Sequence, residues 1–243
     1  MRYLFFISVL IGALNSYIIT AKGIFAGEGY TETEVVDGGS IIGTVKYKGD
    51  LLATVLNLPG AFELPDTSVP ASDKIVVNRF NNGLSFVVIS IAGITQGKKK
   101  EIPAIRPVID QQKNTFVPRV VAILVGTTID ILNGDEELHT IHTRSVKNQP
   151  FNLGTSYKQR ISRTFDYPET IKLFCDIHKK SYCWIVILEN PYFDITDKRG
   201  YFEISDIPPG TYKLKTWHEE LGNLEKEVTI NPGEIIEVEF VYS

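Results

Sequence analysis

One cysteine and two histidines are the residues of this sequence best suited to chemistry. Cys175 and His178 are separated by two residues, and His139 lies in an earlier segment of the chain. A thiolate and two imidazole nitrogens form the trigonal donor set that suits a copper ion cycling between Cu(I) and Cu(II). The sequence therefore predicts a copper site formed by His139, Cys175 and His178.

The spacing of these residues fits a site that transfers electrons. Cys175 and His178 can turn toward one point across a tight loop, whereas His139 must be brought to them by the fold. A site held by the fold changes its geometry little between redox states, which suits an electron carrier. The sequence contains no Ser-His-Asp arrangement, no phosphate-binding glycine loop and no H-E-x-x-H motif, so no bond-making chemistry is expected.

A fourth ligand is harder to identify. Met1 is the only methionine, so a weak axial methionine is not expected, although glutamine or a backbone oxygen can take that position. His142, Ser181 and Cys183 are weaker candidates for a further donor. Ser181 and Cys183 point to the same face of a strand, so Cys183 could lie below the metal. The more frequent role of such a cysteine is that of a small buried apolar residue.

Other titratable residues have simpler interpretations. His142 has the position of a surface-strand histidine, and His218 is expected to be structural and hydrogen-bonded to a neighbour. Asp135, Glu136 and Glu137 are adjacent acids in a turn, where carboxylates are usually solvated. None of them has an evident partner nucleophile.

The two cysteines leave an alternative open. Cys175 and Cys183 could form a disulfide, as cysteines of exported chains often do. That bond would use the thiolate that the proposed metal needs, and it requires Cα atoms within about 7 Å. The sandwich would then be a copper-free structural module.

The elements that must position these residues are expected to be strands. After Gly29, short runs rich in Val, Ile, Tyr, Phe and Thr alternate with turns, and no segment has a sustained helical period. This pattern is typical of sandwiches and barrels, so we predict an all-β chain. The expected strands include Ser40–Tyr47, Leu84–Ile91, Val117–Val125, Thr128–Leu132, Thr170–Phe174, Tyr182–Leu188, Tyr201–Ile204, Thr211–Trp217 and Ile235–Tyr242.

The C-terminal segment carries a specific pattern. Thr196–Ile204 followed by Ile207–Leu214 resembles the carboxypeptidase-regulatory-like (transthyretin-like, Ig-like) β-sandwich. The resemblance implies an early strand of the form I-x-G-x-V, and Ile41–Val45 has that form. We therefore hypothesise one discontinuous domain, residues 36–100 plus 190–243. A second domain, residues 103–189, would be inserted at a loop, where insertion is tolerated.

Residues 103–189 resemble a cupredoxin of the plastocyanin and amicyanin kind. The resemblance lies in two loops, Ile129–His139 and Cys175–Ser181, with Ser181 in the place of the methionine ligand and Thr140 in the place of an asparagine. The wider arrangement is similar to exported proteins often labelled as methylamine-utilisation proteins.

This resemblance implies a Greek-key sandwich that binds one type-1-like copper ion and passes single electrons to a transient redox protein partner. The expected docking surface is an apolar rim around His178, with Tyr182 and Trp184 nearby.

The N-terminus and the charge bear on location and partners. Arg2 precedes an apolar run, Tyr3–Leu14, and Ala21 or Ala26 offers a cleavage position, so residues 1–26 are predicted to be a signal peptide. The mature protein is expected in the periplasm or another extracytoplasmic compartment, with a membrane contact only if this segment stays uncleaved as an anchor. The net charge of −4 disfavours nucleic acid as a partner.

Three functions follow from these observations. The first is an exported copper protein that transfers single electrons and is not an enzyme. The second is a copper-free structural or interaction module. The third is a copper store or chaperone, in which His142 and Cys183 join the site.

Overall fold

The computed structural model describes residues 29–49, 68–72 and 74–243. Every regular element in this part of the chain is a strand, so the prediction of an all-β fold is confirmed. None of the described segments forms a helix of the length and apolarity needed to cross a bilayer. The predicted signal peptide, residues 1–26, lies outside the described residues.

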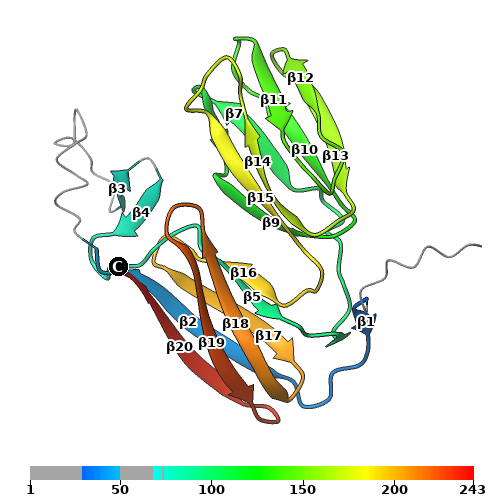
Figure 1. Ribbon diagram of the computed structural model, residues 1–243, viewed down its shortest axis with the longest axis vertical. Coiled ribbons are helices and arrows are strands. Elements are labelled where there is room, and N and C mark those ends of the chain that lie inside the picture. The colour runs from blue at the N-terminus through cyan, green and yellow to red at the C-terminus, as the bar shows by residue number, and fades with distance from the viewer. Residues whose placement is uncertain (1–28, 50–67, 73) are drawn as a thin grey trace, which may run out of the picture.

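The first sandwich consists of a four-stranded and a five-stranded sheet, drawn from green to yellow in Figure 1. The four-stranded sheet has the order β13 (Arg160–Phe165), β10 (Thr127–Asn133), β7 (Val108–Gln112) and β8 (Thr115–Val117). The five-stranded sheet has the order β12 (Asn152–Thr155), β11 (His139–Thr143), β14 (Glu169–Phe174), β15 (Tyr182–Leu188) and β9 (Val120–Leu124).

Alternating side chains explain why these two sheets pack on each other. On β10, Ile129 and Ile131 are fully buried, and on β15, Cys183 and Ile185 are fully buried against them in one apolar core. Successive side chains of a strand point to opposite faces, so one face of each sheet is apolar. Burial of each large aliphatic side chain contributes about 1.5–3 kcal/mol.

The second sandwich combines strands from both ends of the chain, which Figure 1 shows as blue, orange and red strands side by side. One sheet has the order β16 (Phe193–Ile195), β5 (Val88–Ala92), β18 (Gly210–His218) and β19 (Gly222–Ile230). The other has the order β17 (Tyr201–Ile207), β2 (Gly39–Tyr47) and β20 (Ile235–Tyr242). Two short ladders complete the fold: β1 (Thr31–Glu32) with β6 (Gln96–Gly97), and β3 (Ser68–Ser72) with β4 (Ile75–Asn78).

Gly43 in the middle of β2 is required by close packing. A Cβ atom at this position would lie 2.2 Å from the carbonyl oxygen of Val238 and 2.7 Å from the ring of Phe202. The strand β2 pairs with β20 on one side and with β17 on the other. We keep the division into residues 36–100 plus 190–243 and residues 103–189 as a proposal, and these pairings support it.

His218 ends β18 inside the second sandwich. Its side chain is buried, and its Nδ1 accepts hydrogen bonds from the backbone N–H groups of Glu220 and Leu221 at 3.2 and 3.3 Å. Burial lowers the pKa of this imidazole to about 4, which keeps it neutral. The residue therefore holds the β18–β19 hairpin.

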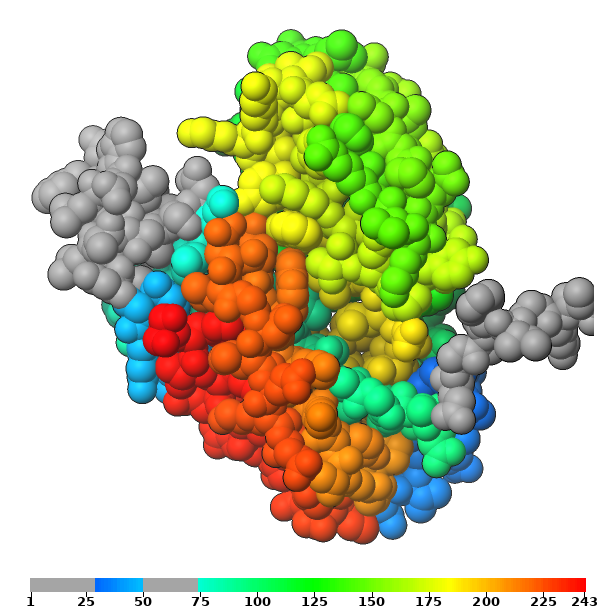
Figure 2. All heavy atoms as spheres, viewed as in Figure 1, coloured from blue at the N-terminus to red at the C-terminus, as the bar shows by residue number. Residues whose placement is uncertain are grey.

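The two sandwiches contact each other through the outer face of β9 and β15. Val120 and Val186 pack on Val88 of β5, and the rings of Trp184 and Trp217 meet edge to face with centroids 5.5 Å apart. In Figure 2 the yellow atoms of the first sandwich lie against the orange atoms of the second. This contact covers the outer face of β9 and β15.

A buried ion pair crosses the same contact. The side chains of Arg119 and Glu219 are 15% and 3% exposed and are hydrogen-bonded to each other. Glu219 also accepts from Trp184 Nε1 at 2.9 Å, and Arg119 donates to the hydroxyl of Tyr182 at 2.5 Å. Burial disfavours the charged form of both groups, but their pairing raises the pKa of Arg119 and lowers that of Glu219. Both groups therefore stay charged.

Candidate metal centre

Three strand ends bring the predicted ligands together at one end of the first sandwich. His139 is the first residue of β11, Cys175 directly follows β14, and His178 lies in the loop before β15. The strands β11 and β14 are antiparallel, with His142 opposite Phe174. In this register the chain that continues past the end of β14 runs beside the start of β11, where Thr140 contacts Cys175 and Asp176, so the two ligand loops face each other.

The three donor atoms converge on a common point. Cys175 Sγ lies 3.9 Å from His139 Nδ1 and 3.8 Å from His178 Nδ1, and the two Nδ1 atoms are 3.0 Å apart. All three atoms lie within 4.8 Å of one another. His139 and Cys175 are buried, whereas the side chain of His178 is 27% exposed.

The surroundings of Cys175 favour the thiolate. Its sulfur accepts hydrogen bonds from Thr140 N at 3.4 Å, Thr140 Oγ1 at 3.7 Å and His178 N at 3.5 Å. Burial would raise the pKa of the thiol, but hydrogen bonds, led by those from the backbone N–H groups of Thr140 and His178, outweigh it and lower the pKa to about 6. A thiolate is the form that binds a metal.

Thr140 joins the two ligand loops. Besides its contacts to Cys175, its hydroxyl accepts a hydrogen bond from Asp176 N at 2.7 Å. The resemblance stated above places an asparagine at this position. In this chain the threonine hydroxyl makes the connection instead.

Asp135 orients the imidazole of His139, which corrects the expectation that it is a solvated acid of a turn. Its Oδ2 lies 3.0 Å from His139 Nε2, and its two oxygens accept from the backbone N–H groups of Lys113 and Asn114 at 2.7 and 2.9 Å. Burial raises the pKa of this carboxyl less than these hydrogen bonds and His139 lower it, so it stays ionised.

The contact with Asp135 selects the tautomer of His139. When Nε2–H donates to Asp135, Nδ1 keeps its lone pair and faces Cys175 and His178. A carboxylate behind a ligand histidine fixes the ring in this way and raises its basicity. The exposed neighbour Glu136 makes no such contact, and Glu137 Oε2 lies 3.7 Å from His178 Nε2.

Asn133 shapes the loop that carries Asp135. Its buried side-chain amide donates to the carbonyl oxygens of Glu137 and Thr155, each at 2.8 Å, and its Oδ1 accepts from Asp135 N at 2.9 Å. Asn133 therefore fixes the loop internally at Asp135 and Glu137 and ties it to β12 at Thr155. The sequence showed the asparagine but not these partners.

The donor set fits a single small metal ion. With bonds of about 2.0 Å to nitrogen and about 2.3 Å to sulfur, a trigonal ion separates sulfur from nitrogen by about 3.7 Å and the two nitrogens by about 3.5 Å. The observed sulfur–nitrogen distances of 3.9 and 3.8 Å agree with this, and the nitrogen–nitrogen distance of 3.0 Å requires only a narrower angle at the metal.

Two of the weaker ligand candidates lie elsewhere. His142 turns its Nδ1 to Asp176 at 3.0 Å on the sheet surface, next to Asn152, so it does not join the site. Cys183 is fully buried in the core of the first sandwich, and burial raises the pKa of its thiol. Its strand neighbours fill the space around it, so it acts as an apolar residue.

The disulfide alternative is wrong in this structure, because Cys175 and Cys183 are both free. Ser181 donates its backbone N–H to His178 O and accepts from Cys175 N, at 2.8 and 3.0 Å, which closes the ligand loop. Its buried hydroxyl has no hydrogen-bond partner within the described part of the chain. Ser181 thus supports the loop through its backbone.

The expected docking rim needs a correction. Tyr182 is buried beside Arg119, and Trp184 packs on Trp217, so both belong to the contact between the sandwiches. Side chains of β15 alternate between the two faces of the five-stranded sheet, and those of Tyr182 and Trp184 point to the outer face. The exposed apolar side chains next to the ligands in sequence are Leu138 and Ile177.

Asp135→Asn is expected to weaken copper binding about 10–100-fold, because an asparagine holds the tautomer of His139 less well and places no negative charge behind its ring. Copper affinity from competition with a chelator gives the measurement, together with the visible spectrum. Glu136→Gln removes the same charge from an exposed neighbour and should change the affinity by less than about twofold. Equal losses in the two variants would show that Asp135 acts only through its charge.

Comparisons with known proteins give partial likenesses. A family model described as Polysaccharide lyase family 4, domain II matches residues 190–238. No curated protein sequence matches the chain. A copper-containing nitrite reductase (NirK) from Thermus scotoductus SA-01 is similar in structure, with 24% identity and a TM-score of 0.34 over 38% of this chain and 24% of that chain. This chain thus matches about a quarter of that reductase.

Two small proteins are similar to part of the chain as well. One is a purple cupredoxin from Nitrosopumilus maritimus, with 20% identity and a TM-score of 0.30 over 34% of this chain and 99% of that chain. The other is amicyanin from Paracoccus versutus (Thiobacillus versutus), with 18% identity and a TM-score of 0.31 over 41% of this chain and 97% of that chain. Each likeness covers less than half of this chain.

Proposed function

We propose that this protein binds one copper ion through His139, Cys175 and His178 and exchanges single electrons with a redox protein partner. The observation that carries the proposal is the convergence of one thiolate and two imidazole nitrogens within 4.8 Å of one another. Bound copper would supply a one-electron couple between Cu(I) and Cu(II). A trigonal set of two histidines and one cysteine is the donor set associated with copper electron transfer.

The protein's own residues prepare the site in three ways. Thr140 and the backbone N–H of His178 hold the sulfur of Cys175 as a thiolate. Asp135 holds the ring of His139 with its Nδ1 turned inward. Burial of Cys175 and His139 excludes water, and the partly exposed ring of His178 offers an edge at the surface for electron exchange.

The rival functions have less support from the geometry. A copper store or chaperone would recruit His142 and Cys183, and neither lies in the group of converging donors. A structural module without metal does not explain why three potential donor atoms converge on one point. Export to the periplasm or another extracytoplasmic compartment stays part of the proposal. It depends on whether residues 1–26 act as a signal peptide.

Titration of the purified, reduced protein with copper tests the proposal. We expect one equivalent to bind, an intense visible absorption band with Cu(II), and reversible loss of that band on reduction. A binding ratio well below one, or binding of Cu(I) with no coloured Cu(II) form, would contradict the electron-transfer function. Zinc titrated in parallel shows whether the site prefers copper, as the general affinity order predicts.

A further inference from the structure

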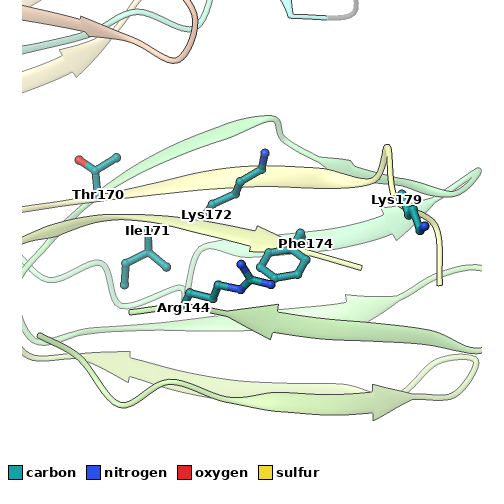
Figure 3. A pocket seen from close by; sticks show the side chains of 6 residues that line it. All are labelled: Arg144, Thr170, Ile171, Lys172, Phe174 and Lys179. Carbon is teal, nitrogen blue, oxygen red and sulfur yellow. The ribbon is translucent and has the colours of Figure 1, made fainter. Parts of the chain in front are cut away.

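The second sandwich covers only part of the outer face of the five-stranded sheet. The second sandwich packs on β9 and β15, through Val120, Val186 and Trp184. On β14 the outward side chains of Thr170 and Lys172 are exposed. A hollow of about 440 Å³ lies on the uncovered part of this face, near β14, and Figure 3 shows the side chains that line it. The residues are Arg144, Thr170, Ile171, Lys172, Phe174 and Lys179.

Three of these side chains are cations without an anionic partner. Arg144, Lys172 and Lys179 form no ion pair with any residue that the structure describes. Asp176, which feels the charge of Arg144, is already hydrogen-bonded to His142 and Asn152. Asp176 therefore offsets only part of the charge of Arg144, and the hollow keeps a net positive charge.

Aromatic rings hold two of the cations in place. Lys172 Nζ lies 3.8 Å from the ring centre of Tyr182, and the guanidinium carbon of Arg144 lies 5.4 Å from that of Phe174. Figure 3 shows Arg144 beside the ring of Phe174. A ring face attracts a cation without neutralising its charge. Both cations therefore lie against a ring and keep their charge for a partner.

The hollow adjoins the metal ligands along the chain. Phe174 immediately precedes Cys175, and Lys179 immediately follows His178. A partner seated on the hollow would therefore lie beside the ligand loop. The chain as a whole has a net charge of −4, so an acidic partner would be repelled elsewhere and attracted here.

We propose that this cationic hollow is the docking surface for an acidic protein, whose carboxylates pair with Arg144, Lys172 and Lys179. The inference rests on the proposed function for the identity of that protein as a redox partner. Opposite charges on the two faces speed encounter and fix the orientation, while the buried area can remain small, as a transient complex requires.

The first test measures anion binding without electron transfer. A hexaglutamate peptide is added to the isotope-labelled full chain, metal-free and Cu(I)-loaded, and backbone amide shifts are recorded by NMR. We expect shifts around Arg144, Lys172 and Lys179 that vanish as ionic strength rises from about 0.01 M to about 1 M. Shifts elsewhere, or none at low salt, would overturn the proposal.

Two double variants separate this site from general charge. Arg144→Gln/Lys172→Gln should weaken peptide binding about tenfold, and leaves the ligand loop unchanged. Lys198→Gln/Lys213→Gln removes the same charge from exposed positions of the second sandwich and should leave binding nearly unchanged. Equal weakening in both would overturn the proposal. Tight, saturable displacement of the peptide by inorganic phosphate would also overturn it, since the hollow would then be a small-anion site.

The second test uses electron transfer itself. Reduced, copper-loaded protein gives one electron to hexacyanoferrate(III), which becomes hexacyanoferrate(II) as Cu(I) becomes Cu(II), and no proton moves. The Arg144→Gln/Lys172→Gln variant should react about tenfold more slowly with this anion, but not with the cationic tris(phenanthroline)cobalt(III). Equal slowing with both reagents would overturn the docking surface. If copper does not bind, neither reagent reacts while peptide binding persists, so the two proposals fail in different ways.

Discussion

Replacing Cys175 with serine is expected to remove the visible absorption of the copper-loaded protein and to weaken copper binding by a factor of about 100 or more. Loss of a hydrogen-bond partner behind a ligand already lowers metal affinity 10–100-fold, so loss of the thiolate itself should have a larger effect. A serine hydroxyl is a hard, neutral donor, and copper favours soft thiolate and imidazole ligands. Copper affinity and the visible spectrum provide the measurement.

The second cysteine provides the control for this experiment. Cys183→Ala removes a thiol that is buried in the core of the first sandwich and takes no part in the group of donors. This variant should keep both the absorption and the copper affinity, and should lose about 1 kcal/mol of stability through the smaller side chain. Retained colour in Cys175→Ser, or lost colour in folded Cys183→Ala, would exclude the proposed ligand set.

Strands with alternating apolar side chains could be predicted from the sequence. The predicted bounds Tyr182–Leu188 and Ile235–Tyr242 are those of β15 and β20. The strand β19, Gly222–Ile230, was missed because only two of its side chains are buried. Backbone pairing with β18 holds this strand in the sheet. Such pairing produces no apolar pattern in the sequence, so the strand could not be recognised there.

The convergence of the three proposed metal ligands could be predicted because their types and spacing carry the signal. His139, Cys175 and His178 converge as the sequence indicated. The role of Asp135 could not be predicted, since it depends on the backbone N–H groups of the turn at Lys113, which the fold brings to the same place. From the sequence alone, Asp135, Glu136 and Glu137 have the pattern of solvated carboxylates in a turn.

The pairing of Arg119 with Glu219 at the contact between the sandwiches could not be predicted from the sequence either. A buried ion pair between residues a hundred positions apart leaves no local pattern in the sequence. Each side chain stabilises the other, because either one alone would be an unpaired charge in a dry contact. The stability of the contact is therefore expected to be sensitive to either residue.

Glu219→Ala is expected to destabilise the protein by about 3–5 kcal/mol, since it leaves Arg119 charged and buried without a partner. It also removes the acceptor of Trp184 Nε1, which packs on Trp217 across the contact. Because the loss falls on the contact, unfolding of the two sandwiches should separate into two steps. Denaturant unfolding followed by near-ultraviolet circular dichroism and calorimetry measures both effects.

Two further variants decide whether the buried pair is the cause. Glu220→Ala removes the neighbouring carboxylate, whose pair with Lys74 is exposed, and should destabilise by at most about 1 kcal/mol. Arg119→Met/Glu219→Leu replaces both charges with apolar side chains and should recover most of the loss, because a well-packed apolar pair is often as stable as a buried ion pair. A double variant as unstable as Glu219→Ala would mean that the shape of this contact, rather than an unpaired charge, limits its stability.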